Sequence, residues 1–359
     1  HNLITEGGGG LEHADCAVLM TSRWATRTRK AYVGWLALAS HELFHVWNGK
    51  RLRPKELGPF DYEREAHTRS LWVVEGITDY YGDLLVHRAG LSTRDELLAS
   101  LSDKIGALET TPGRAVQSIA GASYDAWIKH YRPDENSPNT SISYYVKGAV
   151  VAFLLDLRIR RVTSGRKSLD DVMRAAYEMY SGARGFEERE FRAVFEKTAG
   201  ASFEPFWRPA VDGTSELDYA ETLDFGLRFK TAEPEAGKAP RRASLCAATR
   251  VDNGRLVVSH VRRGTPAHEA GLNVDDEIVA VDEFRVRPDQ LEGRMEQYVV
   301  GDRVSLLVAR RDRLIRLEAI LGADPLQVWQ LEVDPGATPA QLAMLDFWLA
   351  QSGISGHTG

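Results

Sequence analysis

The chain has 359 residues, more than a single hydrophobic core usually accommodates, so two domains are expected. The formal net charge is -6, and charges of both signs are spread along the sequence, which argues against a nucleic-acid partner. No apolar run approaches the roughly 20 residues that a bilayer-spanning helix needs, so no membrane segment is expected.

The first twenty residues predict two strands on either side of a glycine loop. Residues 3–5 and 11–20 are the expected strands, and residues 7–10 are four consecutive glycines. Such a loop could hold a phosphate, but neither a Gly-x-Gly-x-x-Gly nor a Lys-Ser/Thr signature follows it. A turn, or a sheet edge that receives a peptide, is the favoured interpretation. Because the sequence opens on a strand, without Met or a signal peptide, we expect a fragment or a processed chain.

A buried helix is predicted over residues 32–47, because this segment is apolar on all sides. It contains His-Glu-Leu-Phe-His at residues 41–45. Histidines four residues apart lie on one helix face, so His41 and His45 can direct two imidazole nitrogens at one point. With Glu42 as general base, this pattern predicts a catalytic zinc site. The alternative is two hydrogen-bonded core histidines, but burial favours a metal, since an unpaired buried polar group costs roughly 1–3 kcal/mol.

A second helix, expected over about residues 68–87, provides two more carboxylates on one face. Glu75 is the expected third zinc ligand, because a site of two histidines and one carboxylate needs an acid from a neighbouring helix. Asp79 is expected to accept a hydrogen bond from a ligand histidine and fix its orientation. The alternative is a carboxylate pair on the helix surface.

Further helices are expected to build a scaffold around this site. A capping box at Thr93 opens a helix that runs to about residue 108. Other helices are expected over residues 143–162, 168–180 and 187–199. A long polar loop follows residue 111, and its aromatic residues and turn formers suggest a functional segment.

Past Gly213 short alternating strands replace helices, so a domain boundary is expected near residues 215–222. A short amphipathic helix and a frayed tail are expected from residue 338 onward. The predicted fold class is α+β, with a mainly helical lobe that starts with a short β segment and a β-rich second domain. The predicted divisions are residues 1–218 for the helical lobe, 222–322 for the β-rich domain and 323–359 for a C-terminal extension.

Together these segments resemble the glycyl aminopeptidase family of zinc peptidases, which carry a C-terminal PDZ domain and are related to the aminopeptidase N group. The resemblance lies in residues 9–13, 41–48, 71–76, 127–129 and 143–148. It implies a gluzincin, or thermolysin-like, helical lobe with one zinc ion per chain. Such families also carry an N-terminal β domain that is absent here, which supports the expectation of a fragment.

The resemblance also implies roles for residues whose types alone are not diagnostic. Glu12 matches the glutamate that binds the α-amine of the substrate, and Gly10, in the same glycine-flanked strand, is expected to bind substrate as well. Tyr145 matches the tyrosine that stabilises the tetrahedral oxyanion. The aminopeptidase N group has Gly-x-Met-Glu-Asn in this strand, so Leu11 and His13 depart from it and leave the side-chain pocket undefined. By residue type alone, Tyr145 would be a core aromatic and Glu12 a strand-edge charge.

Residues 271–278 are similar to PDZ cores. Such domains hold a chain end or a strand by adding it to a sheet edge, while backbone N–H groups bind the carboxylate. Residues 224–227 are the candidate for that carboxylate-binding loop.

The predicted function is therefore a zinc-dependent aminopeptidase that releases small N-terminal residues, such as Gly or Ala, from peptides. Two alternatives stay open, namely a zinc endopeptidase and an inactive protein that binds peptides through its PDZ-like domain. Cys16 and Cys246 fall in different predicted domains and imply no disulfide framework, so the compartment stays open. The resemblance implies the cytoplasm or periplasm of a bacterium.

Overall fold

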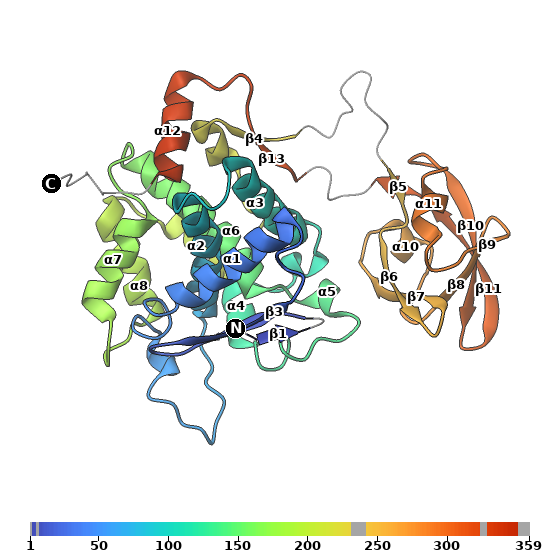
Figure 1. Cartoon of the computed structure of the whole chain (residues 1–359), viewed down its shortest axis with the longest axis horizontal. Helices are drawn as coiled ribbons and strands as arrows, with labels where there is room; N and C mark the ends of the chain where they lie inside the picture. Colours follow the sequence, from blue (N-terminus) through green and yellow to red (C-terminus); the bar gives the residue numbers. More distant parts are fainter. Residues whose placement is uncertain (1, 5–6, 231–241, 324–328, 351–359) are drawn as a thin grey trace.

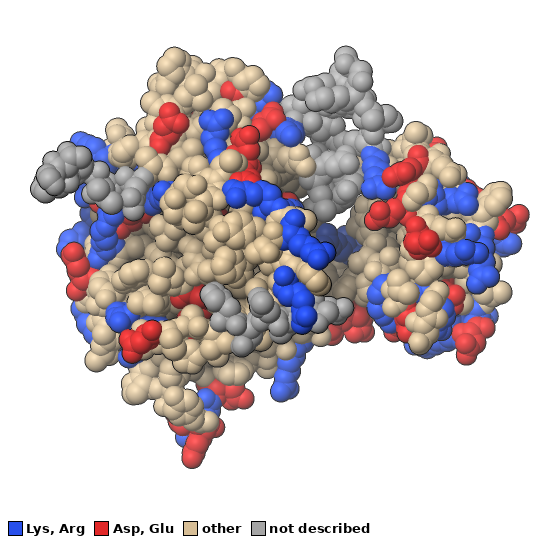
Figure 2. Space-filling model, viewed as in Figure 1, with Lys and Arg blue, Asp and Glu red and all other residues tan. Residues whose placement is uncertain are grey.

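The computed structural model describes residues 2–4, 7–230, 242–323 and 329–350. These residues form a helical body and a smaller body built on a β-sheet, each with its own hydrophobic core (Figure 1). This arrangement confirms the predicted α+β class. Among the described residues, no helix is long and apolar enough to cross a membrane. On the face shown in Figure 2, acidic and basic side chains are interspersed over both bodies.

The helical body begins with a small sheet that differs from the prediction. Its strands follow the order β1 (Asn2–Ile4), β3 (Ala17–Ser22), β2 (Gly9–Glu12). The single strand predicted over residues 11–20 is wrong, because the chain turns after β2, where His13 N donates to Cys16 O at 2.8 Å. β2 is therefore an edge strand, and it packs beside the helix that contains His41 and ends just before His45.

Four helices and one π-helical turn form the centre of this body. They are α1 (Arg29–Phe44), η2 (Trp72–Gly76), α2 (Ile77–Arg88), α3 (Arg94–Glu109) and α6 (Tyr144–Val162). The predicted capping box is present, with Thr93 and Glu96 closing the start of α3. The helix predicted over residues 68–87 is η2 continued by α2 without a break, so its wide first turn carries Glu75.

The long loop predicted after residue 111 is instead partly helical. It contains η3 (Pro112–Ala115), α4 (Ile119–Tyr124) and α5 (Ser137–Thr140). Peripheral helices close the body. Two of them, α7 (Leu169–Tyr180) and α8 (Glu188–Ala199), lie near the predicted positions. Two short elements were not predicted, α9 (Glu204–Trp207) and η4 (Arg208–Asp212).

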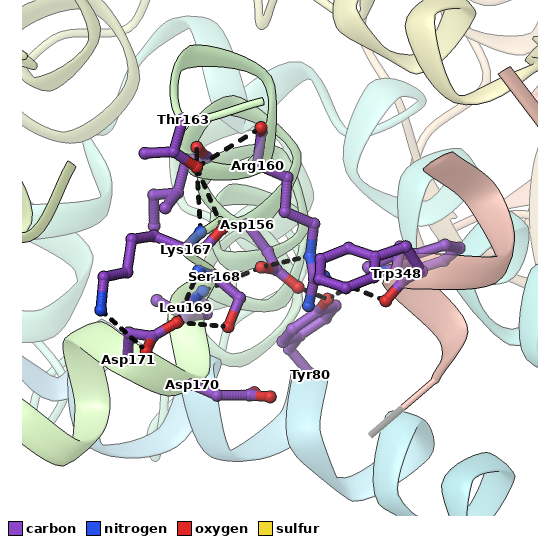
Figure 3. Close-up of polar contacts among 12 residues, drawn as sticks. Tyr80, Asp156, Arg160, Thr163, Lys167, Ser168, Leu169, Asp170, Asp171 and Trp348 are labelled. Carbon is purple, nitrogen blue, oxygen red and sulfur yellow. Dashed lines mark hydrogen bonds and ion pairs between the residues drawn. The ribbon is translucent and has the colours of Figure 1, made fainter. Parts of the chain in front are cut away.

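A buried polar network fixes the C-terminal helix α12 (Pro339–Leu349) to the helical body (Figure 3). Trp348 Nε1 donates to Tyr80 Oη at 2.7 Å, and Tyr80 Oη donates to Asp156 Oδ2 at 2.8 Å. Arg160 Nε donates to the other oxygen of Asp156 at 3.0 Å. Trp348 is fully buried, so the predicted short helix is part of this core. The tail predicted after it lies outside the described residues.

The second body is a sheet in the order β11, β10, β8, β7, β6, with β6 at one edge. Its elements are β5 (Ala243–Ser244), β6 (Ala247–Asp252), β7 (Arg255–Val261), α10 (Pro266–Glu269), β8 (Glu277–Val281), β9 (Phe284–Arg285), α11 (Leu291–Met295), β10 (Arg303–Arg310), β11 (Arg313–Ile320) and β12 (Gly322–Ala323). Asn139 of α5 joins the two bodies, because its Nδ2 donates to Val261 O at 2.9 Å and its Oδ1 accepts from Arg263 N at 2.8 Å.

Residues 224–227, predicted as the carboxylate-binding loop of the second domain, pack against the helical body. They overlap η5 (Ala220–Phe225) and β4 (Leu227–Phe229), and β4 pairs with β13 (Leu331–Val333). Phe225 and Leu227 are fully buried in the first core, so neither side chain is available to a peptide. The second core begins at Ala243, and the boundary near residues 215–222 stays a prediction.

Candidate metal centre and active site

Three side chains converge between α1 and η2. His41 Nε2 lies 2.9 Å from His45 Nε2, and Glu75 Oε2 lies 3.3 and 3.2 Å from these two nitrogens. Tetrahedral ligands bound at about 2.0–2.1 Å to zinc stand roughly 3.3 Å apart, so the three atoms have the spacing of a zinc ligand set. All three side chains are largely buried. The residues present therefore fit a zinc ion.

Asn48 connects the end of α1 to η2 and fixes one ligand. Its carbonyl oxygen lies 2.9 Å from His45 Nδ1, and because a carbonyl can only accept, His45 Nδ1 carries the proton and leaves Nε2 free for a metal. Its side-chain Nδ2 donates to Val73 O at 2.8 Å and to Thr78 Oγ1 at 3.0 Å. Asn48 is fully buried, and no role of its own was predicted for it.

Asp79 lies near the site but is held mainly by another partner. Its Oδ1 is 3.8 Å from His41 Nδ1, beyond hydrogen-bond distance. Its Oδ2 is 2.9 Å from Lys104 Nζ, which also lies 2.9 Å from Asp83. Burial opposes the charge on Lys104, but the two carboxylates outweigh it and raise the pKa of its ammonium. The predicted role of Asp79 in orienting a ligand histidine stays a prediction.

Glu42, the predicted general base, lies between the two histidines on α1 and faces β2. Its side chain is buried, and its Oε2 has no hydrogen-bond partner among the described residues. A Cβ atom on Gly10 would collide with Glu42 Oε1, so only glycine at this position lets β2 approach the glutamate. Gly10 therefore makes room for Glu42, a role beyond the substrate contact that the resemblance implied.

The two glutamates next to the histidines have opposite pKa shifts. Burial would raise the pKa of Glu75, but hydrogen bonds and charge from His41 and His45 outweigh it and lower the pKa to about 2. Glu75 is thus ionised at neutral pH, as a metal ligand must be. At Glu42 burial is the largest cause and raises the pKa above its ordinary value. One carboxylate that stays ionised beside another with a raised pKa is the combination that a hydrolytic metal site needs.

Tyr145 lies on the first turn of α6, and its ring stacks on that of His41 with the centroids 6.2 Å apart. Burial, followed by the charge of Glu75, raises its pKa, so the phenol stays protonated and can donate. Three further aromatic residues surround it. They are His130, Tyr131 and Tyr144, with the His130 centroid 5.5 Å from that of Tyr145. The aromatic content of the segment after residue 111 was the only sequence signal for His130 and Tyr131.

Glu12, at the end of β2, also reaches the site, but with a partner that the sequence did not indicate. Ligand atoms of Glu12, Glu42 and His45 all lie within 4.8 Å of one another. Glu12 Oε1 is also 2.9 Å from Lys50 Nζ, in a half-buried ion pair. The predicted α-amine ligand thus has one oxygen already occupied by an ammonium group of the protein.

Comparison with known proteins identifies two domains in the chain. Residues 34–151 match the M61 glycyl aminopeptidase family, and residues 224–321 match the PDZ domain. The chain carries an M61 peptidase domain followed by a PDZ domain. This confirms the resemblance inferred from the sequence. In the M61 domain, the matched segment contains His41, Glu42, His45, Glu75 and Tyr145, whereas Gly10 and Glu12 precede it.

The M61 peptidase–PDZ chain is also similar to solved structures. An aminopeptidase N family protein from Idiomarina loihiensis matches with a TM-score of 0.88 and 29% identity over 97% of this chain. The match covers 61% of that protein, so this chain spans less than two thirds of its length. The HtrA-type protease AlgW with decapeptide matches 24% of this chain and 30% of that one at 21% identity, with a TM-score of only 0.23. No curated protein sequence matches the chain.

Proposed function

We propose that this chain is a zinc-dependent aminopeptidase that releases small residues, such as glycine or alanine, from peptide N-termini. The observation that carries the proposal is the convergence of His41, His45 and Glu75 beside the buried carboxylate of Glu42. The M61 glycyl aminopeptidase match supports the same substrate class. Two histidines and one carboxylate are a ligand set typical of catalytic zinc, so zinc is the proposed metal, one ion per chain.

A zinc ion held by these residues would supply a Lewis acid that polarises the scissile carbonyl and lowers the pKa of water. Glu42 accepts the proton of the attacking water and later transfers it to the leaving amine. Its buried position supports this role, because a raised pKa brings the carboxylate closer to the pH at which it must exchange protons. Tyr145 remains protonated and donates a hydrogen bond to the oxyanion.

The substrate backbone is proposed to add to the open edge of β2. This strand is the edge of its sheet, it packs beside α1, and Gly10 keeps it close to Glu42. An extended peptide pairs with such an edge through main-chain hydrogen bonds and needs no particular side chain. The strand thus offers a binding mode that places a peptide beside the proposed base.

At the amino end of the substrate, Glu12 is the proposed ligand of the α-ammonium group. A carboxylate accepts several hydrogen bonds, so the oxygen that Lys50 leaves free can still bind an ammonium. The same ion pair favours a second candidate function, a zinc endopeptidase, because a carboxylate that is already neutralised does not require a substrate ammonium. The two functions differ only in that requirement.

The PDZ domain is proposed to bind a second peptide segment by β-augmentation. Its strand β6 is the edge of the sheet, so its outer main-chain groups have no strand partner among the described residues. The segment bound there is a chain end or an internal strand.

Hydrolysis of free and N-acetylated glycyl and alanyl substrates tests the proposed function. We expect zinc-loaded protein to cleave the free substrates much faster, and we expect a chelator to abolish this activity until zinc is returned. Equal rates on blocked substrates would instead identify the endopeptidase. A zinc-loaded protein that cleaves neither kind would reject both.

A further inference from the structure

Lys50 places a positive charge directly beside Glu12, the proposed ligand of the substrate α-ammonium group. Its Nζ lies 2.9 Å from Glu12 Oε1, and both side chains are half-buried, with 29% and 22% of their surface exposed. An ion pair at this depth is less screened than one on the surface. The proposed mechanism assigns a role to the carboxylate of Glu12 but none to Lys50.

The position of Lys50 is fixed by the turn that follows the zinc helix. Lys50 N donates to His45 O at 3.1 Å, and Gly49 N donates to Leu52 O at 2.7 Å. Arg51 Nη1 closes the same turn by donating to Val46 O at 2.7 Å. The backbone of Lys50 is therefore hydrogen-bonded to that of His45, a proposed metal ligand, and its ammonium group lies against Glu12.

Without this ammonium, Glu12 would be a competing metal ligand. Its carboxylate lies within 4.8 Å of ligand atoms of both Glu42 and His45, which is close enough for the three to share an ion. Carboxylate oxygens are ordinary zinc ligands, and a fourth protein ligand closes the open position that a catalytic site needs. Three carboxylates, those of Glu12, Glu42 and Glu75, would then surround one dication.

We propose that Lys50 is a positioning residue that keeps Glu12 off the metal and holds its carboxylate ready for the α-ammonium group of the substrate. The part that concerns substrate rests on the proposed function, whereas the part that concerns metal binding does not. Lys50 thus acts through Glu12 and does not touch the reacting atoms.

Zinc affinity, measured by competition with a chromogenic chelator, tests the metal part without any turnover. In Lys50→Met, Glu12 joins the ligand set, so we expect zinc to bind about tenfold more tightly. Adding Glu12→Gln to this variant should return the affinity to that of Glu12→Gln alone. Lys50→Arg keeps the cation and should behave as wild type. Lys30→Met is the matched control, because it removes an ion-paired lysine from the exposed start of α1.

Turnover of free and N-acetylated substrates tests the substrate part. Lys50→Met should lower kcat on any substrate that the wild type cleaves, because Glu12 then occupies the open position on the metal. In the Glu12→Gln background, adding Lys50→Met should not lower kcat further. Two results would overturn the proposal: an unchanged zinc affinity in Lys50→Met, or an effect of Lys50→Met that persists undiminished beside Glu12→Gln. If the zinc-loaded wild type cleaves no peptide, the proposed function fails, while the affinity comparison still decides what Lys50 does.

Discussion

Gly148 on α6 and Gly76 at the end of η2 pack backbone against backbone. A Cβ atom on Gly148 would lie 2.7 Å from Gly76 Cα and 3.1 Å from Trp72 O. Glu75 precedes one glycine, and Tyr145 lies about one turn before the other on α6. This contact therefore sets the distance between the third proposed metal ligand and the proposed oxyanion donor.

Gly148→Ala should force η2 and α6 apart, because rigid backbone cannot yield as a flexible side chain would. We expect the free energy of unfolding to fall by about 1–3 kcal/mol and zinc affinity to fall with it. Gly34→Ala on α1 is the control, since a Cβ there meets no atom within 4 Å. Alanine at this helical position should stabilise the protein by about 0.5–1 kcal/mol. Denaturant titration distinguishes the two, and a Gly148→Ala protein as stable as wild type would contradict the packing argument.

Asn48→Asp should weaken the metal site while keeping the size of the side chain. The carboxylate cannot donate to Val73 O or Thr78 Oγ1, so the tie between α1 and η2 is lost and a buried charge is introduced. We expect zinc affinity to fall roughly 10- to 100-fold. Chelator competition measures it. Wild-type affinity in Asn48→Asp would show that the main-chain bond from His45 to Asn48 O is enough.

Lys147 should make the stability of the protein depend on alkaline pH. It is almost fully buried in α6, and burial lowers its pKa from 10.5 to about 8 although Glu109 and Glu216 oppose the shift. Between these values the unfolded chain binds a proton at this lysine that the folded chain does not. The free energy of unfolding should therefore rise with pH from about 8 to 10.5.

Denaturant titrations across this pH range should show the rise in wild type and in Lys30→Met, whose lysine is exposed. The rise should be absent in Lys147→Met, which should also be more stable than wild type at pH 7, because no charge must then be buried. If the free energy of unfolding still rises with pH in Lys147→Met, a titratable group other than Lys147 causes the rise.

The proximity of His41 and His45 could be predicted from sequence because it is local and follows from the helical repeat. Glu75 was predicted to join them because a site of two histidines and one carboxylate needs an acid from a neighbouring helix, and it lies beside them. The start of α3 was equally predictable, since the capping box of Thr93 needs only residues three apart. Such features depend on few long-range contacts.

Other features depended on tertiary contacts that no local pattern encodes. The ion pair of Lys50 with Glu12 joins residues 38 positions apart across a turn and a sheet edge. Residues 224–227 have the glycine of a binding loop, with Gly226 at a φ of 62°, but Phe225 and Leu227 are drawn into the first core. The single strand predicted over residues 11–20 failed because the turn after β2 contains neither glycine nor proline.

The most direct measurement of the central claim compares zinc content and peptide hydrolysis in wild type and Glu42→Gln. Glu42 is placed as a base and not as a ligand, so elemental analysis should find one zinc ion per chain in both proteins. Glutamine cannot accept the proton, so turnover of free glycyl and alanyl substrates should be lost in the variant although the metal is retained. A Glu42→Gln protein that keeps zinc and cleaves these substrates at the wild-type rate would contradict the account.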